Sequence, residues 1–190
     1  MGCSSHKVIP QVKVIRIALI GTRGSGKTAL ISSFLMRKFA LAYVPTTTVN
    51  IGMKSYSFKD SNAIVTIEVW ELYEAKGVSD SFNYIVIVLD CTKPAEELSE
   101  ELLSFTSALS LRSTPSHMSV ALTKCDCLPE AHQKLLTAMQ KTLPLPEDVT
   151  LYATSASDQA GIDFMFRDLA KADRAPTISR DTSVAALPSA

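Results

Sequence analysis

The stretch Gly21-Thr22-Arg23-Gly24-Ser25-Gly26-Lys27-Thr28 decides the fold of this 190-residue chain. It fits the pattern GxxxxGK[ST] and lies between an apolar run at residues 12–20 and a helix-like segment at residues 28–39. In such a loop the glycines let backbone N–H groups cradle phosphate oxygens, and the positive end of the following helix adds to the site. The Lys27 ammonium supplies a charge to the outer phosphates, and the Thr28 hydroxyl can ligate Mg²⁺. A chance glycine-rich turn is the alternative, which the flanking elements disfavour.

The rest of the chain alternates strand-like and helix-like segments. Apolar and β-branched runs predict strands over residues 12–20, 53–58, 63–70, 84–89, 118–122 and 149–153. Apolar side chains at helical spacing predict helices over residues 28–39, 94–109, 129–141 and 161–171. Alternation of this kind indicates a parallel sheet, and the polar turn at residues 59–62 adds one hairpin. We therefore expect an α/β fold, a three-layer P-loop NTPase sandwich with a mostly parallel sheet and one antiparallel edge strand.

Length and composition allow one domain. Lys plus Arg and Asp plus Glu both total 19, so the net charge of zero argues against a nucleic-acid partner. No apolar run reaches the roughly 18 residues of a membrane span, and four cysteines without a regular framework favour the reducing cytoplasm. We expect a lead-in at residues 1–11, a nucleotide-binding domain at residues 12–172, and a disordered tail, rich in Ser, Thr, Ala and Pro, at residues 173–190.

The tetrapeptide Thr123-Lys124-Cys125-Asp126 indicates which base is bound. It follows the predicted strand at residues 118–122, so it should lie at the carboxyl edge of the sheet, where nucleotides bind in open α/β folds. There the Asp126 carboxylate could accept both N–H bonds from the guanine edge, which adenine cannot offer, and the Lys124 stem could cover the base. An adenine-specific P-loop kinase is therefore disfavoured, as it also is by the lack of an Arg-rich lid segment.

Over about residues 12–171 the chain resembles the Ras-superfamily small GTPases, with a Rab-like character. Their [NT]KxD motif matches Thr123-Lys124-Cys125-Asp126, and their SA[KL] loop looks like Ser155-Ala156-Ser157, in which Ser157 is a departure. The resemblance implies binding of GTP or GDP with Mg²⁺ and a protein effector or regulator. The residues implied to hold the nucleotide are Gly21, Thr22, Arg23, Gly24, Ser25, Gly26, Lys27, Thr28, Ala29, Thr46, Thr123, Lys124, Asp126, Ser155, Ala156 and Ser157.

The effector loop of these GTPases looks like Tyr43-Val44-Pro45-Thr46. The resemblance implies that the Thr46 hydroxyl joins Thr28 on Mg²⁺ and that the Thr46 N–H reaches the γ-phosphate. The run Thr46-Thr47-Thr48 leaves open which threonine is the ligand.

The main departure from the sequence of these GTPases comes directly after the third predicted strand. These GTPases read W-D-x-A-G-Q there, whereas this chain reads Trp70-Glu71-Leu72-Tyr73-Glu74-Ala75. Glu71 replaces the aspartate that holds a Mg²⁺-bound water in the family. Glu74 replaces the glycine whose N–H contacts the γ-phosphate, and Ala75 replaces the glutamine that orients the attacking water. A register three residues later restores an acid and a glycine, but it puts Val78 at the glutamine.

The stretch that should hold the switch helix, from Trp70 to Asp90, is also shorter than the family usually has, so the helix should be mostly deleted. Arg23 replaces a small residue beside the γ-phosphate, although it could equally point into solvent. Two functions follow from this degenerate second switch. The chain is either a nucleotide-holding module with slow or absent hydrolysis, or a GTPase that cycles with groups supplied by a partner.

The amino terminus, Met1-Gly2-Cys3-Ser4-Ser5-His6-Lys7, resembles a dual acylation signal. Gly2 would be myristoylated and Cys3 palmitoylated, although His6 departs from the M-G-x-x-x-[ST] pattern. One myristoyl chain binds a membrane only marginally, so stable anchoring would need both chains. We expect a cytoplasmic protein on the cytoplasmic face of a membrane, with a plain flexible terminus as the alternative.

Overall fold

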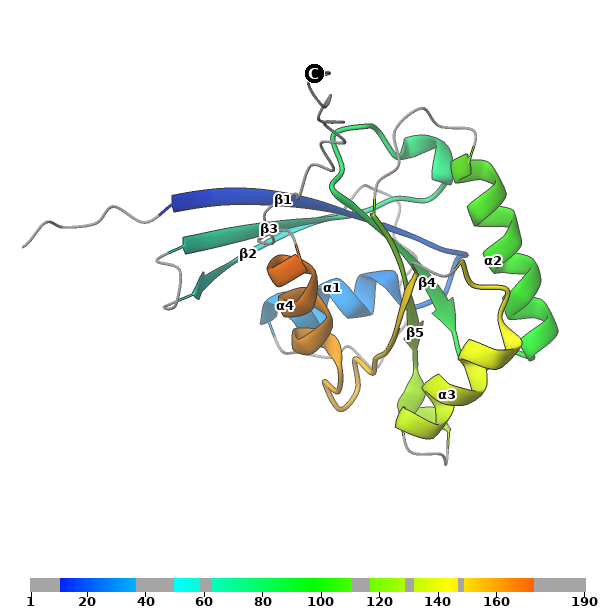
Figure 1. Cartoon of the computed structure of the whole chain (residues 1–190). Helices are drawn as coiled ribbons and strands as arrows, with labels where there is room; N and C mark the ends of the chain where they lie inside the picture. Colours follow the sequence, from blue (N-terminus) through cyan, green and yellow to red (C-terminus); the bar gives the residue numbers. More distant parts are fainter. Residues whose placement is uncertain are drawn as a thin grey trace, which may run out of the picture.

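The structure, a computed structural model, describes residues 11–36, 50–58, 63–110, 117–128, 132–146 and 149–172. Its middle layer is a six-stranded sheet with the strand order β2-β3-β1-β4-β5-β6 (Figure 1). The strands are β1 (Gln11–Ile20), β2 (Asn50–Phe58), β3 (Ala63–Glu71), β4 (Tyr84–Asp90), β5 (His117–Thr123) and β6 (Thr150–Ala153). Every neighbouring pair is parallel except β2 with β3, which confirms the predicted antiparallel edge strand.

Helices cover both faces of the sheet. They are α1 (Lys27–Met36), α2 (Ala95–Ser110), α3 (His132–Thr142) and α4 (Ile162–Ala172), with short 3₁₀ turns η2 (Ala75–Gly77) and η3 (Cys125–Cys127). One apolar core joins the sheet to α1 and α4, and a second joins it to α2 and α3. The arrangement, visible in Figure 1, is the three-layer α/β fold that the alternating pattern predicted.

The central strands are buried on both sides, which explains their continuous apolar sequences. All seven residues of β4 are buried, and the apolar side chains of β1 alternate between the two cores. Because β1, β4 and β5 pair in parallel, their carboxyl ends lie at one edge of the sheet, where the candidate site lies.

Most element boundaries lie within one residue of the predicted ones. The main difference is β2, which begins at Asn50 rather than at residue 53, because its antiparallel register with β3 continues to the pair of Asn50 with Glu71. β1 begins one residue earlier than expected, at Gln11, and α4 ends at Ala172. The hairpin turn at residues 59–62, the predicted lead-in up to residue 10 and the tail at residues 173–190 lie outside the described residues.

Candidate nucleotide-binding site

The predicted phosphate loop lies between the end of β1 and the first turn of α1. Gly24 and Gly26 have φ angles of +80° and +97°, in the left-handed region that favours glycine. A Cβ atom on Gly26 would also approach the Thr123 hydroxyl to 3.2 Å. The loop therefore needs glycine at position 26 for its conformation and for its close packing against β5.

Thr123, the last residue of β5, ties the phosphate loop to the rest of the sheet edge. Its hydroxyl lies 2.5 Å from the Ser25 carbonyl oxygen and 3.1 Å from that of Leu89. The residue is buried, so water does not compete for these contacts. A single side chain thus links the two motifs that were predicted to bind phosphate and base.

Lys27 is a buried cation that is held by backbone oxygens. Its side chain donates to the carbonyls of Gly21 and Thr22 at 2.8 Å and 2.9 Å, and the residue is 5% exposed. Burial lowers the pKa of Lys27, and the nearby charges of Glu71 and Glu101 work against that shift. Within the described ranges no carboxylate pairs directly with the ammonium group. A buried, incompletely neutralised lysine at this loop suits an anionic phosphate.

Thr28 and Glu71 meet at the place where a metal ion is expected. The Thr28 hydroxyl donates to the two Glu71 carboxylate oxygens at 2.7 Å and 2.9 Å, and Glu71 is 3% exposed. Hydroxyl and carboxylate oxygens are the ligands that Mg²⁺ prefers. The pair fits a magnesium ion bound together with the nucleotide. Glu71, rather than Glu74, is the acid that contacts Thr28, and Glu74 is exposed.

A cavity of about 150 Å³ lies next to the phosphate loop. Three separate segments meet around it: the start of α1, the turn after β5 and the loop after β6. Its lining residues are Gly26, Ala29, Leu30, Thr123, Lys124, Asp126, Cys127, Thr154, Ala156, Ser157 and Ile162. Apart from Ser155, the residues of the two predicted guanine motifs that were expected to bind the nucleotide are therefore brought together at one cavity.

Asp126 and Lys124, which both line this cavity, are held by hydrogen bonds. Asp126 accepts a 2.7 Å bond from the Ser155 hydroxyl. Lys124 adopts a left-handed conformation, with φ 60°, and its ammonium lies 2.5 Å from an Asp90 oxygen. Burial acts to raise the pKa of Asp90, but hydrogen bonds from Lys124 and Thr92 outweigh it and lower the pKa.

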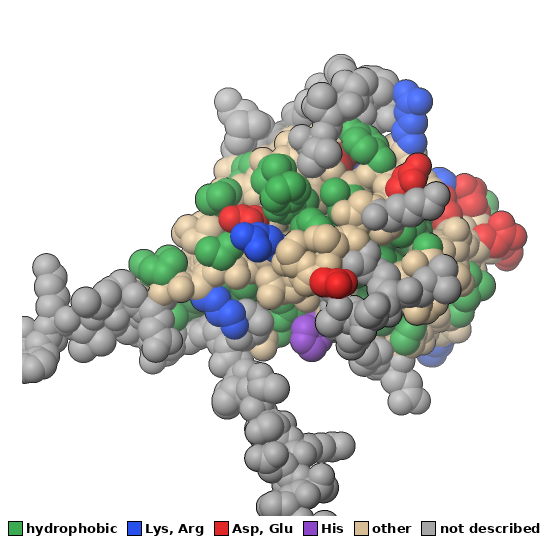
Figure 2. Space-filling model, turned by 90° about the horizontal axis from the view of Figure 1, so that it is seen from above, with side chains coloured by type: hydrophobic (Ala, Val, Ile, Leu, Met, Phe, Trp, Pro, Cys, Tyr) green, Lys and Arg blue, Asp and Glu red, His purple; other side chains and the backbone are tan. Residues whose placement is uncertain are grey.

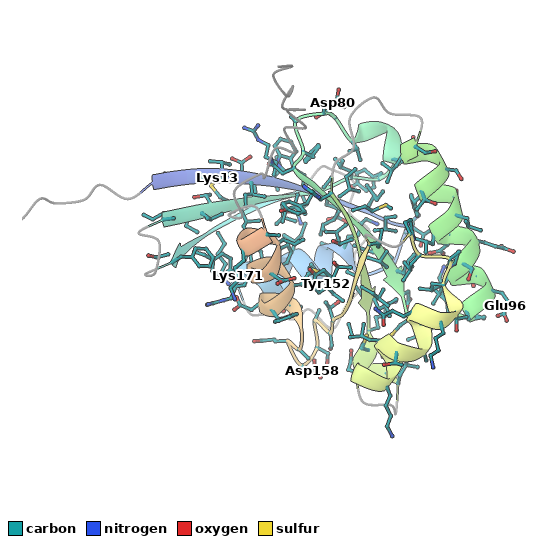
Figure 3. All side chains as sticks on the ribbon, viewed as in Figure 1. Lys13, Asp80, Glu96, Tyr152, Asp158 and Lys171 are labelled. Atoms are coloured by element: carbon teal, nitrogen blue, oxygen red, sulfur yellow. The ribbon has the colours of Figure 1, made fainter. Side chains whose placement is uncertain are left out.

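The loop after β6 is shaped by its own hydrogen bonds. Ser155 is buried, its N–H donates to the Ala160 carbonyl, and its hydroxyl accepts from the Asp158 N–H at 3.3 Å. Asp158, labelled in Figure 3, marks this loop at the lower edge of the view. The buried Ser155 hydroxyl thus supports Asp126, whereas Ser157, two residues later, is exposed and lines the cavity.

Some predicted residues lie outside the described part of the chain. These are Thr46, the second expected metal ligand, and the two expected acylation sites, Gly2 and Cys3. Arg23 is described and exposed.

Two acidic residues near the site were not predicted from the sequence. Asp90 binds Lys124, and Glu101 of α2 accepts from the Thr22 hydroxyl. The available signal for Glu101 was its four-residue spacing from Glu97, which puts both carboxylates on one helix face, and the same spacing between Glu97 and Lys93, just before the helix.

Between β3 and β4 the structure has only the three-residue turn η2, in agreement with the predicted loss of the switch helix. Leu72, Val78 and Phe82 from this segment are buried in the core below α2. Tyr73 and Glu74 are exposed and Ala75 is half-buried.

A sequence model of the Ras family matches residues 16–174, which include the phosphate loop, the end of β3 and the guanine motif. The chain belongs to the Ras family. Members of this family bind guanine nucleotides together with Mg²⁺ and act through effectors and regulators. The chain is thus a Ras-family small GTPase-like protein, and its α/β fold is that of the family.

Similarity to individual proteins is more limited. Rab-like protein 6 from Bos taurus, Homo sapiens and Mus musculus is 32%, 33% and 30% identical over 60 residues. The match covers 32% of this chain and 9%, 8% and 8% of the three relatives. The matched region is thus less than a tenth of the length of these relatives. Among the described helices, none is long and apolar enough to cross a membrane.

Proposed function

We propose that this protein is a membrane-tethered module that binds GTP or GDP with Mg²⁺ and hydrolyses GTP slowly or not at all. The observation that carries the proposal is the stretch from the end of β3 to β4. Glu71, the last residue of β3, contacts Thr28, but the residues after it supply no side chain in place of the water-orienting glutamine.

Hydrolysis by this family depends on placing a water molecule in line with the γ-phosphate. At the position of the glutamine the chain has Ala75, whose methyl group offers no hydrogen bond. Glu74 stands at the glycine position of the family motif, and its side chain is exposed. Positioning supplies much of the rate in such a reaction, so its loss should leave binding intact and slow the chemistry.

The same segment is also poorly suited to a large conformational change. Leu72, Val78 and Phe82 are buried, and the Phe82 ring packs edge-on against Trp70 with the ring centroids 5.9 Å apart. The Leu72 N–H donates to the Leu19 carbonyl at 2.9 Å. Moving the segment would expose side chains worth roughly 1.5–3 kcal/mol each on burial. We infer that it stays in place whether GDP or GTP is bound.

The outer face of the β1–β3–β2 part of the sheet supports the proposal that this chain binds a partner protein. Val12 and Met53 are 67% and 60% exposed there, and Val14 and Ile51 are also exposed. In Figure 2, which views the molecule from above, hydrophobic side chains lie on this side of the molecule. Exposed apolar groups that gather on one face are typical of an interaction surface, which suits an effector or regulator.

The proposals of membrane anchoring and of cellular location are based on the sequence of the amino terminus alone. Acylation of Gly2 and Cys3 would give the two chains that durable membrane binding requires. The protein would then act on the cytoplasmic face of a membrane.

The test is to identify the nucleotide that co-purifies with the full chain in the presence of Mg²⁺. We expect guanine nucleotide with a large fraction of GTP, since GTP that is not hydrolysed stays bound. Bound adenine nucleotide would refute the guanine assignment. Bound GDP alone would favour the alternative, a GTPase that turns over.

A further inference from the structure

We infer that Glu101 of α2 is a positioning residue for Lys27, which it holds in place through Thr22. The inference rests on the proposed nucleotide binding and names a residue for it that belongs to none of the recognised motifs. It concerns the outer side of the phosphate loop, the side that faces α2.

Glu101 differs from the other acidic residues of its helix. The α2 helix carries Glu96, Glu97, Glu100 and Glu101. Glu96, labelled in Figure 3, points away from the sheet into solvent, and Glu97 is 49% exposed. The Glu101 side chain is only 11% exposed. Burial of a carboxylate is unfavourable unless it is paired, so its partners define its role.

The first partner of Glu101 is the phosphate loop itself. The Thr22 hydroxyl lies 3.3 Å from each Glu101 carboxylate oxygen. The carbonyl of the same threonine accepts the 2.9 Å bond from the Lys27 ammonium. Thr22 therefore joins the carboxylate on α2 to the lysine that is expected to contact the phosphates.

The second partner of Glu101 is Lys93, just before α2. Its ammonium contacts both Glu97 and Glu101, and these hydrogen bonds raise the pKa of Lys93. An ionised partner keeps the Glu101 carboxylate oriented, so the carboxylate can in turn restrain Thr22. The Lys93 N–H also donates to the carbonyl of Asp90, whose side chain holds Lys124. One short loop after β4 thus supports both the phosphate side and the base side of the site.

The test compares Glu101→Gln, Thr22→Val and the double variant in the full chain with Mg²⁺. The measured quantity is the dissociation rate of GDP carrying an N-methylanthraniloyl fluorophore. We expect each single variant to release it roughly tenfold faster, because a hydrogen bond to a charged group is lost. The double variant should be no faster than the quicker single variant, because both changes break the same link. Thr22→Ser, which keeps the hydroxyl, should restore the slow rate.

Glu100→Gln is the matched control, since Glu100 is exposed on the same helix. Its release rate should equal that of the wild type, which separates the link through Thr22 from a general effect of removing a charge from the helix.

Wild-type rates in both single variants, or additive effects in the double variant, would overturn the role of Glu101 and leave the proposed function standing. If Glu101→Gln fails to fold, Thr22→Val with its Thr22→Ser rescue decides the question. If the wild type binds the probe no better than Lys27→Ala, the proposed function and this inference fall together.

Discussion

The hydroxyl of Thr28 donates to both carboxylate oxygens of Glu71, at 2.7 Å and 2.9 Å. The contact joins the first turn of α1 to the end of β3. Although glutamate is one methylene longer than the aspartate of the family motif, its carboxylate still fits beside the threonine and accepts its hydrogen bond. The chain therefore keeps an acid in contact with Thr28, although its sequence lacks the glutamine of the family motif.

We expect Mg²⁺ to slow nucleotide release, and we expect Glu71 to be required for that effect. In Glu71→Gln the carboxylate charge that favours Mg²⁺ is lost while the shape is kept. Release of labelled GDP from this variant with Mg²⁺ should approach the rate measured with a chelator. Glu71→Asp is the matched control, because it restores the residue of the family motif. Equal Mg²⁺ dependence in wild type and Glu71→Gln would rule out a role for Glu71 in metal binding.

Base selectivity should depend on Asp126. In the wild type, GTP and GDP should displace a labelled guanine nucleotide far better than ATP, because losing a matched pair of hydrogen bonds discriminates strongly. Asp126→Asn should shift preference toward xanthine nucleotides, whose edge presents an oxygen in place of the amino group. Ser155→Ala, which removes the 2.7 Å support of Asp126, should weaken binding without changing the preferred base. Competition by ATP on a par with GTP would refute the guanine assignment.

The segment between β3 and β4 should be a fixed part of the core. Phe82→Ala should destabilise the fold by roughly 3 kcal/mol, because it leaves a cavity below α2. Hydrogen exchange at residues 72–82 should be the same with GDP and with a non-hydrolysable GTP analogue. A large difference in exchange between the two states would show that a conformational switch survives.

Lowering the pH should reduce the stability of the fold, in part because the Asp90 carboxylate becomes protonated. The pKa of Asp90 is lowered from its ordinary value of 3.8, so its contribution to stability is present above that value and is lost as the pH falls below it. Asp90→Asn should remove this part of the acid dependence of unfolding, measured by denaturant titration at several pH values. An unchanged acid dependence in the variant would assign the effect to other carboxylates.

Membrane association should need both acylation sites. Gly2→Ala should make the protein soluble in cell fractionation, and Cys3→Ser should leave a weak association that washes off, since one myristoyl chain binds with only about 10⁴ M⁻¹. The expressed chain must keep an unmodified amino terminus. Full solubility of the wild type would refute the tether.

The fold and both binding motifs could be predicted because local sequence determines them. The glycine spacing around Lys27 and the apolar run of β4 reflect requirements of backbone conformation and burial. The register of the segment after β3 stayed open, because acids occur at both Glu71 and Glu74 and only the contact with Thr28 distinguishes them. The role of Glu101 could not be predicted, since it depends on how α2 packs against the phosphate loop.

The most direct test of the central claim is single-turnover release of phosphate from GTP bound to the purified full chain with Mg²⁺ and without a partner. We expect a rate at or below the slow intrinsic range of the family, roughly 10⁻⁴ per second. The bound nucleotide should remain GTP through the assay. Phosphate release that is complete within a few minutes would refute slow or absent hydrolysis and would show that this chain is an active GTPase.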